Sequence, residues 1–322
     1  MIEKTNSRFI IRLLFILSLL SVALISVDLQ AQNETSKFAI IGYLPGYQLN
    51  SIKPDAISGV TDLIYFGLVP NKNGRLAESP IPRAALIKLQ SIKQQTHCRV
   101  LLSVGGWDRS NGFAELTSSA VTRQLFIRNL VQYCRQNRFH GIDYDWEHPK
   151  TQIELSNYVK LITETSIACD PYSMTVTVAQ AAWQNLGKDV YQVVDRVHLM
   201  TYDHDFPQAS YDKSTKDIER VIDWGCPSEK LAMGIPFYGR NKYRMTLTYA
   251  EITENQLVDS AKDVIAGFAF NGQATVAKKV RYAAEQKLAG VMIWELGQDS
   301  SRSELGLLET IKRHAEATAT VK

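Results

Sequence analysis

Short apolar runs rich in β-branched and aromatic residues recur along the chain, and segments with a helical period separate them. The runs, which are the candidate strands, cover residues 38–44, 62–68, 99–104, 141–145, 173–178, 196–201, 231–237 and 291–295. Most of them are almost continuously apolar, which is typical of strands covered on both faces. Apolar positions follow the helical spacing near 81–95, 120–135, 152–167, 215–224, 275–287 and 302–315.

This alternation of strands and helices predicts an α/β fold with parallel strands joined by right-handed crossovers. Eight strands between residues 38 and 295 fit a closed (β/α)8 TIM barrel in a single domain. A doubly wound open sheet is the alternative, but no Gly-x-Gly-x-x-Gly follows a strand to support a nucleotide-binding fold. No internal repeat or low-complexity linker divides the chain, so we expect one domain without a large insertion.

The first thirty-one residues have the pattern of a secretory signal peptide. An apolar run at 13–27 ends near the small residue Ala31, and the basic residues before it are Lys4, Arg8 and Arg12. We expect cleavage after Ala31, which leaves a mature domain at 32–322 in a secreted or periplasmic location. An uncleaved membrane anchor is the alternative, but serines interrupt the run and it is short of the roughly 20 residues that span a bilayer.

The composition adds limits on partners and on covalent chemistry. Apolar residues make up 45% of the chain and charged residues 21%, which allows a large core and excludes disorder. The net charge is +3 and no basic run is present, so we expect no nucleic-acid partner. Export would permit disulfides among Cys98, Cys134, Cys169 and Cys226, in one of three pairings. Because Cys134 continues an apolar helical stripe, we expect buried structural thiols, with at most one disulfide.

The stretch from Phe139 to Pro149 alternates acidic and apolar residues with the period of a strand. Asp143, Asp145 and Glu147 share one face, and an amphipathic edge strand with solvated acids would show the same pattern. In a closed barrel, however, the interior covers one strand face and helices cover the other. The acids would then point inward, about 6.6 Å apart, with Glu147 at the mouth. Burial and like charge raise the pKa of at least one such acid, so the stretch predicts an active site.

These acids favour proton transfer over metal binding. Ca²⁺ and Mg²⁺ need oxygens about 2.0–2.6 Å from one ion, and carboxylates along a straight strand diverge too far for that. We therefore expect neither a metal nor a cofactor. Glu147 could protonate a leaving oxygen while Asp145 stays charged beneath it. His97, His198 and His204 show no pairing with a serine or cysteine nucleophile, so the sequence does not support a hydrolytic triad.

The acidic stretch resembles the Asp-x-x-Asp-x-Asp-x-Glu signature of glycoside hydrolase family 18, the chitinases and their relatives. Four further motifs at predicted strand ends are similar to motifs of this family: Ser103-Val104-Gly105-Gly106, Met200-Thr201-Tyr202-Asp203, and the runs 234–240 and 290–295. The resemblance covers essentially the whole mature chain, which would form the catalytic barrel. Two residues depart from the pattern. His140 stands where the family has its first Asp, and could hydrogen-bond Asp143 in its place, while His148 replaces a more usual Tyr.

The resemblance implies retaining hydrolysis in which the substrate assists, because no enzyme carboxylate attacks the sugar. The acetamido oxygen of a bound N-acetylglucosamine would attack its own anomeric carbon and form an oxazolinium ion. Glu147 would act as acid and then as base, and Asp145 would accept the acetamide N–H. Tyr202 would orient the acetamide oxygen, and Asp143 would share a proton or hydrogen bond with Asp145.

By the same resemblance, a set of cleft residues would bind the substrate. Trp294 would form the floor of the sugar subsite, although a core aromatic is the alternative for it. The other candidates are Asp203, Gln180, Tyr238, Arg240, Gly106, Trp107, Tyr43 and Phe66, of which the last three could equally be packing residues. Trp183 is either a second sugar platform or merely exposed.

We therefore expect an exported chitinase that cleaves β-1,4-linked N-acetylglucosamine polymers. Residues 241–289 leave little room for a subdomain beside the predicted helix, which favours an open cleft and internal (endo) cleavage. An endo-β-N-acetylglucosaminidase acting on protein-linked glycans would use the same acids, whereas a non-hydrolytic chitin lectin would lack Glu147. The expected partner is chitin or an N-acetylglucosamine oligosaccharide, bound by a monomer that does not contact the membrane after the signal peptide is removed.

Overall fold

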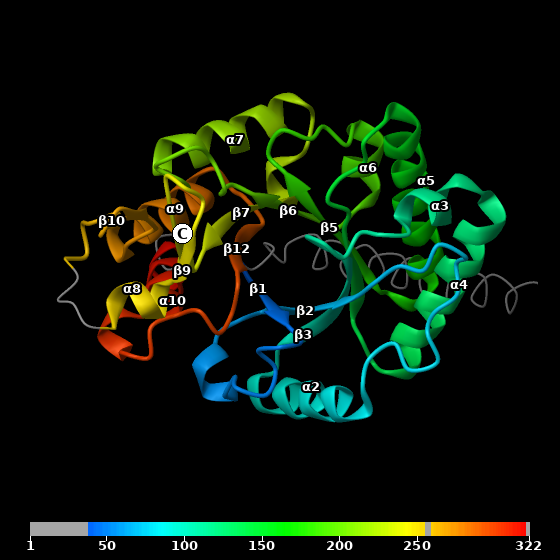
Figure 1. The fold of residues 1–322 in the computed structure, drawn as a ribbon, viewed down its shortest axis with the longest axis horizontal. Coiled ribbons are helices and arrows are strands. Elements are labelled where there is room, and N and C mark those ends of the chain that lie inside the picture. Colours follow the sequence, from blue (N-terminus) through cyan, green and yellow to red (C-terminus); the bar gives the residue numbers. More distant parts are fainter. Residues whose placement is uncertain (1–37, 255–258, 320–322) are drawn as a thin grey trace, which may run out of the picture. The chain divides into compact units, whose positions relative to one another are not determined.

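Eight parallel strands close into a barrel at the centre of the fold (Figure 1). The computed structural model describes residues 38–254 and 259–319, so the signal peptide expected at 1–31 lies outside the described residues. The barrel order is β1-β12-β7-β6-β5-β4-β3-β2, so the predicted (β/α)8 barrel is confirmed. Its strands are β1 (Ala39–Pro45), β2 (Asp62–Leu68), β3 (Arg99–Gly105), β4 (Gly141–Asp145), β5 (Thr175–Ala181), β6 (Arg196–Met200), β7 (Leu231–Pro236) and β12 (Gly290–Trp294).

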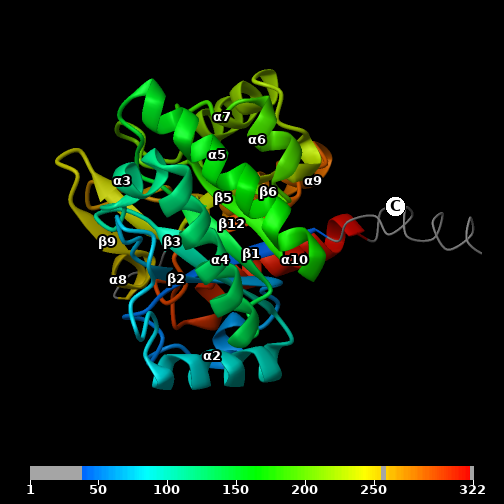
Figure 2. The same ribbon diagram turned by 90° about the vertical axis from the view of Figure 1, so that its right-hand side faces the viewer.

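Helices surround the barrel and cover the outer faces of its strands (Figures 1 and 2). They are α2 (Arg83–Thr96), α3 (Phe113–Ser118), α4 (Ala120–Gln136), α5 (Gln152–Cys169), α6 (Lys188–Val193), α7 (Tyr211–Asp223), α9 (Gln273–Glu285) and α10 (Leu307–Ala319). Short 3-10 turns lie at Pro54–Ile57, Asp170–Tyr172, Ser228–Lys230 and Ser303–Leu305. Several helices begin where a side chain accepts a backbone N–H: Ser119 caps α4, Thr151 caps α5 and Ser210 caps α7.

Alternation along the strands produces two separate apolar layers. Residues that point into the barrel form a small cluster that includes Ile41, Tyr43 and Leu101. The much larger cluster between barrel and helices includes Phe126, Leu130 and many other fully buried side chains. Burying one large aliphatic or aromatic side chain contributes roughly 1.5–3 kcal/mol, so the outer layer supplies most of the hydrophobic stabilisation. The interior is left free for polar residues near the mouth of the barrel.

The chain segment between β7 and α9 forms a small antiparallel sheet, which the sequence pattern did not predict. Its order is β10-β11-β8-β9, and Figure 1 labels β9 and β10 beside α8 at the left of the view. Its elements are β8 (Tyr238–Asn241), β9 (Thr246–Thr248), α8 (Tyr249–Thr253), β10 (Val264–Ile265) and β11 (Phe268–Ala269). Thr248 and Glu251 form a reciprocal capping box at the start of α8. In its described residues, this connection therefore holds a small sheet and a short helix rather than a large subdomain.

The four cysteines are all free and buried. Cys134 is fully buried in the outer apolar layer, as its place in a helical stripe predicts. The expectation of structural thiols is confirmed, and no disulfide joins them. Among the described residues, no helix combines the length and apolar character needed to span a bilayer.

Candidate active site

A cleft of about 1120 Å³ opens at the C-terminal ends of the barrel strands. Side chains from several strand ends line it, including Tyr43, Asp145, Met200 and Trp294. This is the face on which barrels of this architecture carry their active sites, because the loops after the strands gather there.

The three acids of β4 and the residues after it point inward, as their spacing predicts. Asp143 is fully buried, Asp145 is 3% exposed and Glu147 is half-buried; the last two line the cleft. Burial, and then the negative charges of Glu147 and Asp143, raise the pKa of Asp145 well above its usual value. Burial and the nearby charge of Asp203 raise the pKa of Glu147 to about 7. Glu147 can therefore exchange a proton near neutral pH.

Asp143 forms the floor beneath this pair and is held by three neighbours. The Tyr43 hydroxyl donates to its Oδ2 at 2.9 Å, and Thr177 donates to its Oδ1 at 2.6 Å. The Nδ1 of His198 lies 3.2 Å from Oδ1. The direct hydrogen bond expected between Asp143 and Asp145 is absent from these contacts, and Asp145 Oδ1 has no partner among the described residues.

Trp294 is the last residue of β12 and lines the cleft. Its ring centroid is 5.7 Å from that of Tyr43 and 5.1 Å from that of Phe66. Phe66 itself is buried and does not line the cleft, so it supports the tryptophan from behind. Gly106 makes room for this support, because an added Cβ would lie 2.0 Å from the Phe66 ring. Of the predicted substrate contacts, Phe66 and Gly106 therefore act in packing.

One wall of the cleft comes from the end of β6 and the small sheet. Tyr238 donates a short hydrogen bond to Asp203, and Arg240 forms an ion pair with the same carboxylate at 2.8 Å. Tyr202 also lines the cleft, and among the described residues its hydroxyl has only a weak contact, 3.9 Å from the sulfur of Met292. The Tyr202 hydroxyl is therefore available to a ligand.

Two exposed tryptophans also line the cleft. Trp107 is 67% exposed and Trp183 is 64% exposed, and both line the cleft. The ring of His148 contacts Trp183 at a centroid distance of 4.8 Å, and its Nε2 lies 3.5 Å from a carboxylate oxygen of Glu147. Burial lowers the pKa of His148, so at neutral pH it faces Glu147 as an uncharged ring. The sequence showed only that His148 stands in place of a more usual Tyr.

Two further expectations are wrong in their contacts. Gln180 lies on the opposite face of β5 from Ala179 and Ala181, which line the cleft. Gln180 is fully buried, and its amide donates to the backbone carbonyl of Gln184. It is thus a structural residue, because an alternating strand turns it toward the helices. His140 does not reach Asp143; instead its Nδ1 accepts the backbone N–H of Val100 at 2.8 Å.

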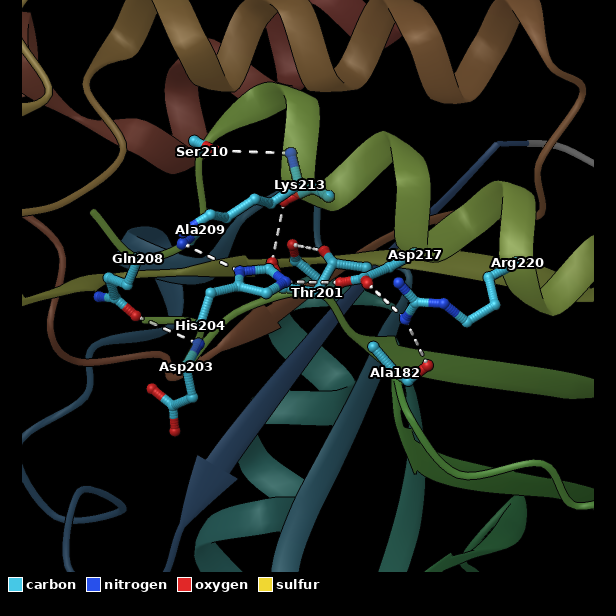
Figure 3. Close-up of polar contacts among 12 residues, drawn as sticks. Ala182, Thr201, Asp203, His204, Gln208, Ala209, Ser210, Lys213, Asp217 and Arg220 are labelled. Carbon is cyan, nitrogen blue, oxygen red and sulfur yellow. Dashed lines mark hydrogen bonds and ion pairs between the residues drawn. The ribbon is translucent and has the colours of Figure 1, made fainter. Parts of the chain in front are cut away.

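His204 stabilises the loop that follows β6 (Figure 3). Its Nδ1 accepts the backbone N–H of Ala209, and its Nε2 lies 2.7 Å from Asp217 on α7. Arg220 holds the other oxygen of Asp217 at 2.9 Å and also donates to Ala182. Both ring nitrogens of His204 are occupied, so it fixes the cleft wall and is not the base of a triad. This agrees with the sequence, which supported no such triad.

His198 is the functional candidate that the sequence pattern missed. It occupies the inward face of β6 two residues before Met200, and its ring is fully buried. The same period-two spacing that identified the acids runs through His198, Met200 and Tyr202, and it could have marked the histidine as inward-facing. A buried inward histidine beside an acid is a common feature of proton-transfer sites.

The described residues contain no group of three or more His, Cys, Asp or Glu side chains arranged to hold a metal ion. What the cleft presents is a carboxyl with a pKa near neutrality, a second carboxyl beneath it, a free tyrosine hydroxyl and an aromatic floor. Such an arrangement can protonate a leaving oxygen and orient a sugar.

Comparisons with known proteins place this geometry in a family. The sequence profile described as Glycosyl hydrolases family 18 matches residues 39–299. Probable chitinase 2 of Drosophila melanogaster is 25% identical over an alignment of 286 residues, covering 66% of this chain and 58% of that protein. The chain spans about half the length, or less, of the curated relatives it matches.

Solved structures share the fold. The GH18 chitinase from the chitin utilization locus of Flavobacterium johnsoniae superposes with a TM-score of 0.77 at 24% identity, over 87% of this chain and 94% of that chain. The GH18 chitinase of Cycas revoluta solved in complex with (GlcNAc)3 gives a TM-score of 0.72 at 23% identity, over 87% and 99%.

Proposed function

The chain belongs to glycosyl hydrolase family 18, and we propose that it is a retaining chitinase that cleaves β-1,4-linked N-acetylglucosamine polymers with Glu147 as acid and base. The observation that supports this proposal most directly is the place of Glu147. Its carboxyl has a pKa of about 7 and lies in the same cleft as Asp145, Tyr202 and Trp294. The Cycas revoluta chitinase of the same fold was solved with an N-acetylglucosamine oligomer, which supports the choice of substrate.

In the proposed reaction the substrate supplies the nucleophile. The acetamide oxygen of the sugar attacks its own anomeric carbon, and the glycosidic C–O bond breaks. Glu147 gives its proton to the departing oxygen, which leaves as the hydroxyl of the shortened chain. The ionised Glu147 then takes a proton from water, whose oxygen attacks the anomeric carbon and opens the oxazolinium ring with retained configuration.

Asp145 and Tyr202 would position the acetamide group. Asp145 Oδ1 has no partner among the described residues and can accept the acetamide N–H. As positive charge develops on the ring that forms, a carboxylate at this place stabilises it. In the part of the chain that the structure describes, the Tyr202 hydroxyl has only the weak Met292 contact, so it can donate to the acetamide oxygen. Trp294, held by Tyr43 and Phe66, would carry the apolar face of the sugar.

Endo action is part of the proposal. The described part of the connection between β7 and α9 contains only the small sheet and α8, which supports a cleft with a low wall rather than a tunnel. A chitin chain could then enter along its length. Hydrolysis of soluble chitin oligomers should yield several product lengths from the earliest times. Release of disaccharide alone from one chain end would contradict endo action without affecting the role of Glu147.

The role of Glu147 is tested by Glu147→Gln, which keeps the shape of the side chain but removes the ionisable proton. We expect turnover of chitin oligomers to fall by at least about a thousandfold. Glu147 would act as acid in the first step and as base in the second, and general acid–base catalysis contributes roughly 10²–10⁴-fold to the rate of a step. Binding of (GlcNAc)4 measured by calorimetry should persist. Glu254→Gln, outside the cleft lining, is the matched control and should leave turnover unchanged. Retained hydrolysis by Glu147→Gln would refute the assignment.

Substrate choice has one serious alternative, because an endo-β-N-acetylglucosaminidase would use the same acids on protein-linked glycans. A panel of chitin oligomers beside a high-mannose glycopeptide separates the two activities. We expect cleavage of the chitin oligomers; cleavage of the glycopeptide alone would favour the alternative. Binding of chitin without cleavage of either substrate would favour the lectin.

Export is proposed from the sequence alone, with residues 1–31 as the signal peptide and the catalytic barrel in residues 32–322. The mature protein recovered from a secreting host should begin at Gln32, as N-terminal sequencing would determine. An intact N-terminus in a membrane fraction would support the uncleaved anchor instead.

A further inference from the structure

His198 lies beneath the proposed acid pair, and the proposed mechanism gives it no role. Its side chain is fully buried. Its Nδ1 is 2.9 Å from the Tyr43 hydroxyl oxygen and 3.2 Å from Asp143 Oδ1, while its Nε2 has no hydrogen-bond partner among the described residues. An imidazole placed against a buried carboxylate can decide how many protons the neighbouring acids hold.

The hydrogen bonds determine which nitrogen of His198 carries its proton. The Tyr43 hydroxyl has a single proton, and it donates that proton to Asp143 Oδ2 at 2.9 Å. The hydroxyl oxygen must then accept from the His198 Nδ1 that lies 2.9 Å away. Nδ1 therefore bears a hydrogen that is donated to the Tyr43 oxygen, and Asp143 Oδ1 lies 3.2 Å from the same nitrogen.

The surroundings of Nε2 indicate that the ring is neutral. A protonated ring would bury an N–H that has no acceptor, whereas a neutral ring leaves only an unpaired acceptor there. Asp143 then receives hydrogen bonds from the Tyr43 and Thr177 hydroxyls, with the Nδ1–H of His198 also close to it. Donors directed at a carboxylate stabilise its ionised form.

We propose that His198 is a positioning residue: its Nδ1–H holds the Tyr43 hydroxyl in the orientation that donates to Asp143 and lies close to Asp143 itself. Asp143 then stays ionised, and the proton held by the buried acids stays with the Asp145–Glu147 pair, from which Glu147 delivers it. The contacts of the two aspartates agree with this proposal. Asp143 accepts a hydrogen bond on each carboxylate oxygen, which stabilises its ionised form, whereas Asp145 has an oxygen with no partner among the described residues. The inference rests on the proposed function, since the proton of this pair affects turnover only if Glu147 is the acid.

The groups around this floor include several acids and phenols. They are Tyr43 from β1, Asp143, Asp145 and Glu147 from β4 and its extension, Tyr202 after β6, and Tyr158 from α5. None of these groups carries a positive charge at neutral pH. Hydrogen-bond donors therefore stabilise the Asp143 carboxylate in place of a cation, and His198 orients one of these donors, the Tyr43 hydroxyl, while lying 3.2 Å from the carboxylate.

Three substitutions at one position separate this role from simple packing. In His198→Asn, the side-chain amide can take the place of Nδ1–H. In His198→Gln, the amide reaches the position of Nε2 instead. His198→Leu fills the space but supplies no hydrogen-bond donor. We expect the Asn variant to keep kcat on chitin oligomers within about threefold. The Gln and Leu variants should lose about tenfold or more, the effect of roughly one pKa unit on the acids. His97→Asn in an exposed loop is the control and should leave turnover unchanged.

The pH profile of activity separates the two explanations, because a loss of packing alone would not shift it. Without the Nδ1–H donor, the ionised form of Asp143 loses stabilisation, and acid inactivates the enzyme more readily. The acid limb of the kcat/KM profile should therefore move to higher pH in the Gln and Leu variants and stay in place in the Asn variant. A Leu variant with the wild-type profile, or rescue by Gln rather than Asn, would overturn the proposal.

A second measurement needs no substrate. Nitrogen NMR of histidine-labelled protein, with the His198 signal identified by its loss in His198→Asn, reports which ring nitrogen is protonated. We expect the neutral Nδ1–H form between pH 6 and 8. The Nε2–H form or an imidazolium would refute the inference even in a fully active enzyme. Conversely, an inactive wild-type protein with the Nδ1–H form would refute the proposed function and leave the proton arrangement standing.

Discussion

Glu147 combines two causes of a high pKa that act independently. Burial disfavours its charged form, and the carboxylate of Asp203 across the cleft repels that form further. A hydrogen bond from the Trp107 backbone acts in the opposite direction. The balance leaves the carboxyl with a pKa of about 7, so a general acid at this site loses its proton just above neutrality.

Replacing Asp203 by Asn should shift this balance in a known direction. In the proposed reaction Glu147 must be protonated to act, so kcat/KM should fall by about tenfold per pH unit above the pKa of Glu147. Without the Asp203 charge that pKa is lower, and the alkaline limb of the profile should move to lower pH. Asp205→Asn is the control, since the Asp205 side chain is 96% exposed and its one ion pair among the described residues is with Arg244, at 3.7 Å. An unmoved alkaline limb in Asp203→Asn would contradict this account.

The sequence identified the residues whose role follows from strand alternation and missed those that depend on contacts across the barrel. Asp143, Asp145 and Glu147 could be placed inward because their spacing is regular and the barrel covers both strand faces. Gln180 shows the limit of the resemblance, because a shift of one residue turns a side chain from the cleft to the helices. The partners of His140 and His198 lie on other strands, and no local pattern contains them.

At the scale of elements, the turn that ends β3 carries the support for the aromatic floor. Gly105 and Gly106 have φ angles of +99° and +109°, in the region that favours glycine. The backbone N–H of Gly106 donates to the Asp145 carbonyl at 2.6 Å, which fixes the turn against β4. The missing Cβ of Gly106 leaves room for Phe66, and Phe66 in turn contacts Trp294.

Gly106→Ala should therefore destabilise the protein by about 3 kcal/mol or more, the sum of a strained φ and an overpacked ring. Gly187→Ala is a matched control, because its φ is also positive, at +85°, yet nothing lies within 4 Å of an added Cβ. Gly187→Ala should lower the free energy of unfolding only by the backbone strain, about 1–2 kcal/mol. Urea denaturation of both variants provides the comparison, and equal losses would show that contact with Phe66 is unimportant.

The elements with a strong repeating pattern were predicted and the short ones were not. β2 and β4 begin and end where their apolar runs do, and α4 and α5 extend only slightly beyond their predicted ends. α3, α6 and α8 have five or six residues, too few to show a helical period. The strands of the small sheet have two to four residues, and tertiary contacts such as the Gln208 hydrogen bonds to Tyr238 and Ala269 hold them.

At the scale of the whole molecule, a fully buried lysine opposes folding at neutral pH. Lys279 on α9 donates from Nζ to the Asn271 side chain at 2.8 Å. Burial lowers its pKa to about 7, although the charges of Asp263 and Asp217 act the other way. Between this value and the unfolded value near 10.4, the folded chain binds fewer protons than the unfolded chain. The contribution of Lys279 to stability is therefore least favourable at and below pH 7 and improves as the pH rises.

Lys279→Met should raise the melting temperature, because removal of a buried charge outweighs the loss of one hydrogen bond. The gain should be largest at pH 6–7, on the order of a few kcal/mol, and should shrink toward pH 10. Lys278→Met, on an exposed position of the same helix, is the control and should show no such dependence. A gain that stayed constant with pH would contradict a perturbed lysine.

Chemical labelling of the buried cysteines should measure unfolding of the protein. Burial raises the pKa of the Cys169 and Cys226 thiols to about 12 and that of Cys134 well above its usual value. Thiols react as thiolates, so a maleimide or disulfide reagent should label the native protein very slowly and the urea-unfolded protein fully. Mass spectrometry would measure the extent of labelling, and fast labelling of the native protein would show that the thiols are not buried.

Because all four cysteines are free, no covalent bridge ties distant parts of the chain together. If the chain is exported as proposed, it can fold after translocation without an enzyme that forms disulfides. Its folding then depends on packing alone, and it should fold equally well in a reducing cytosol.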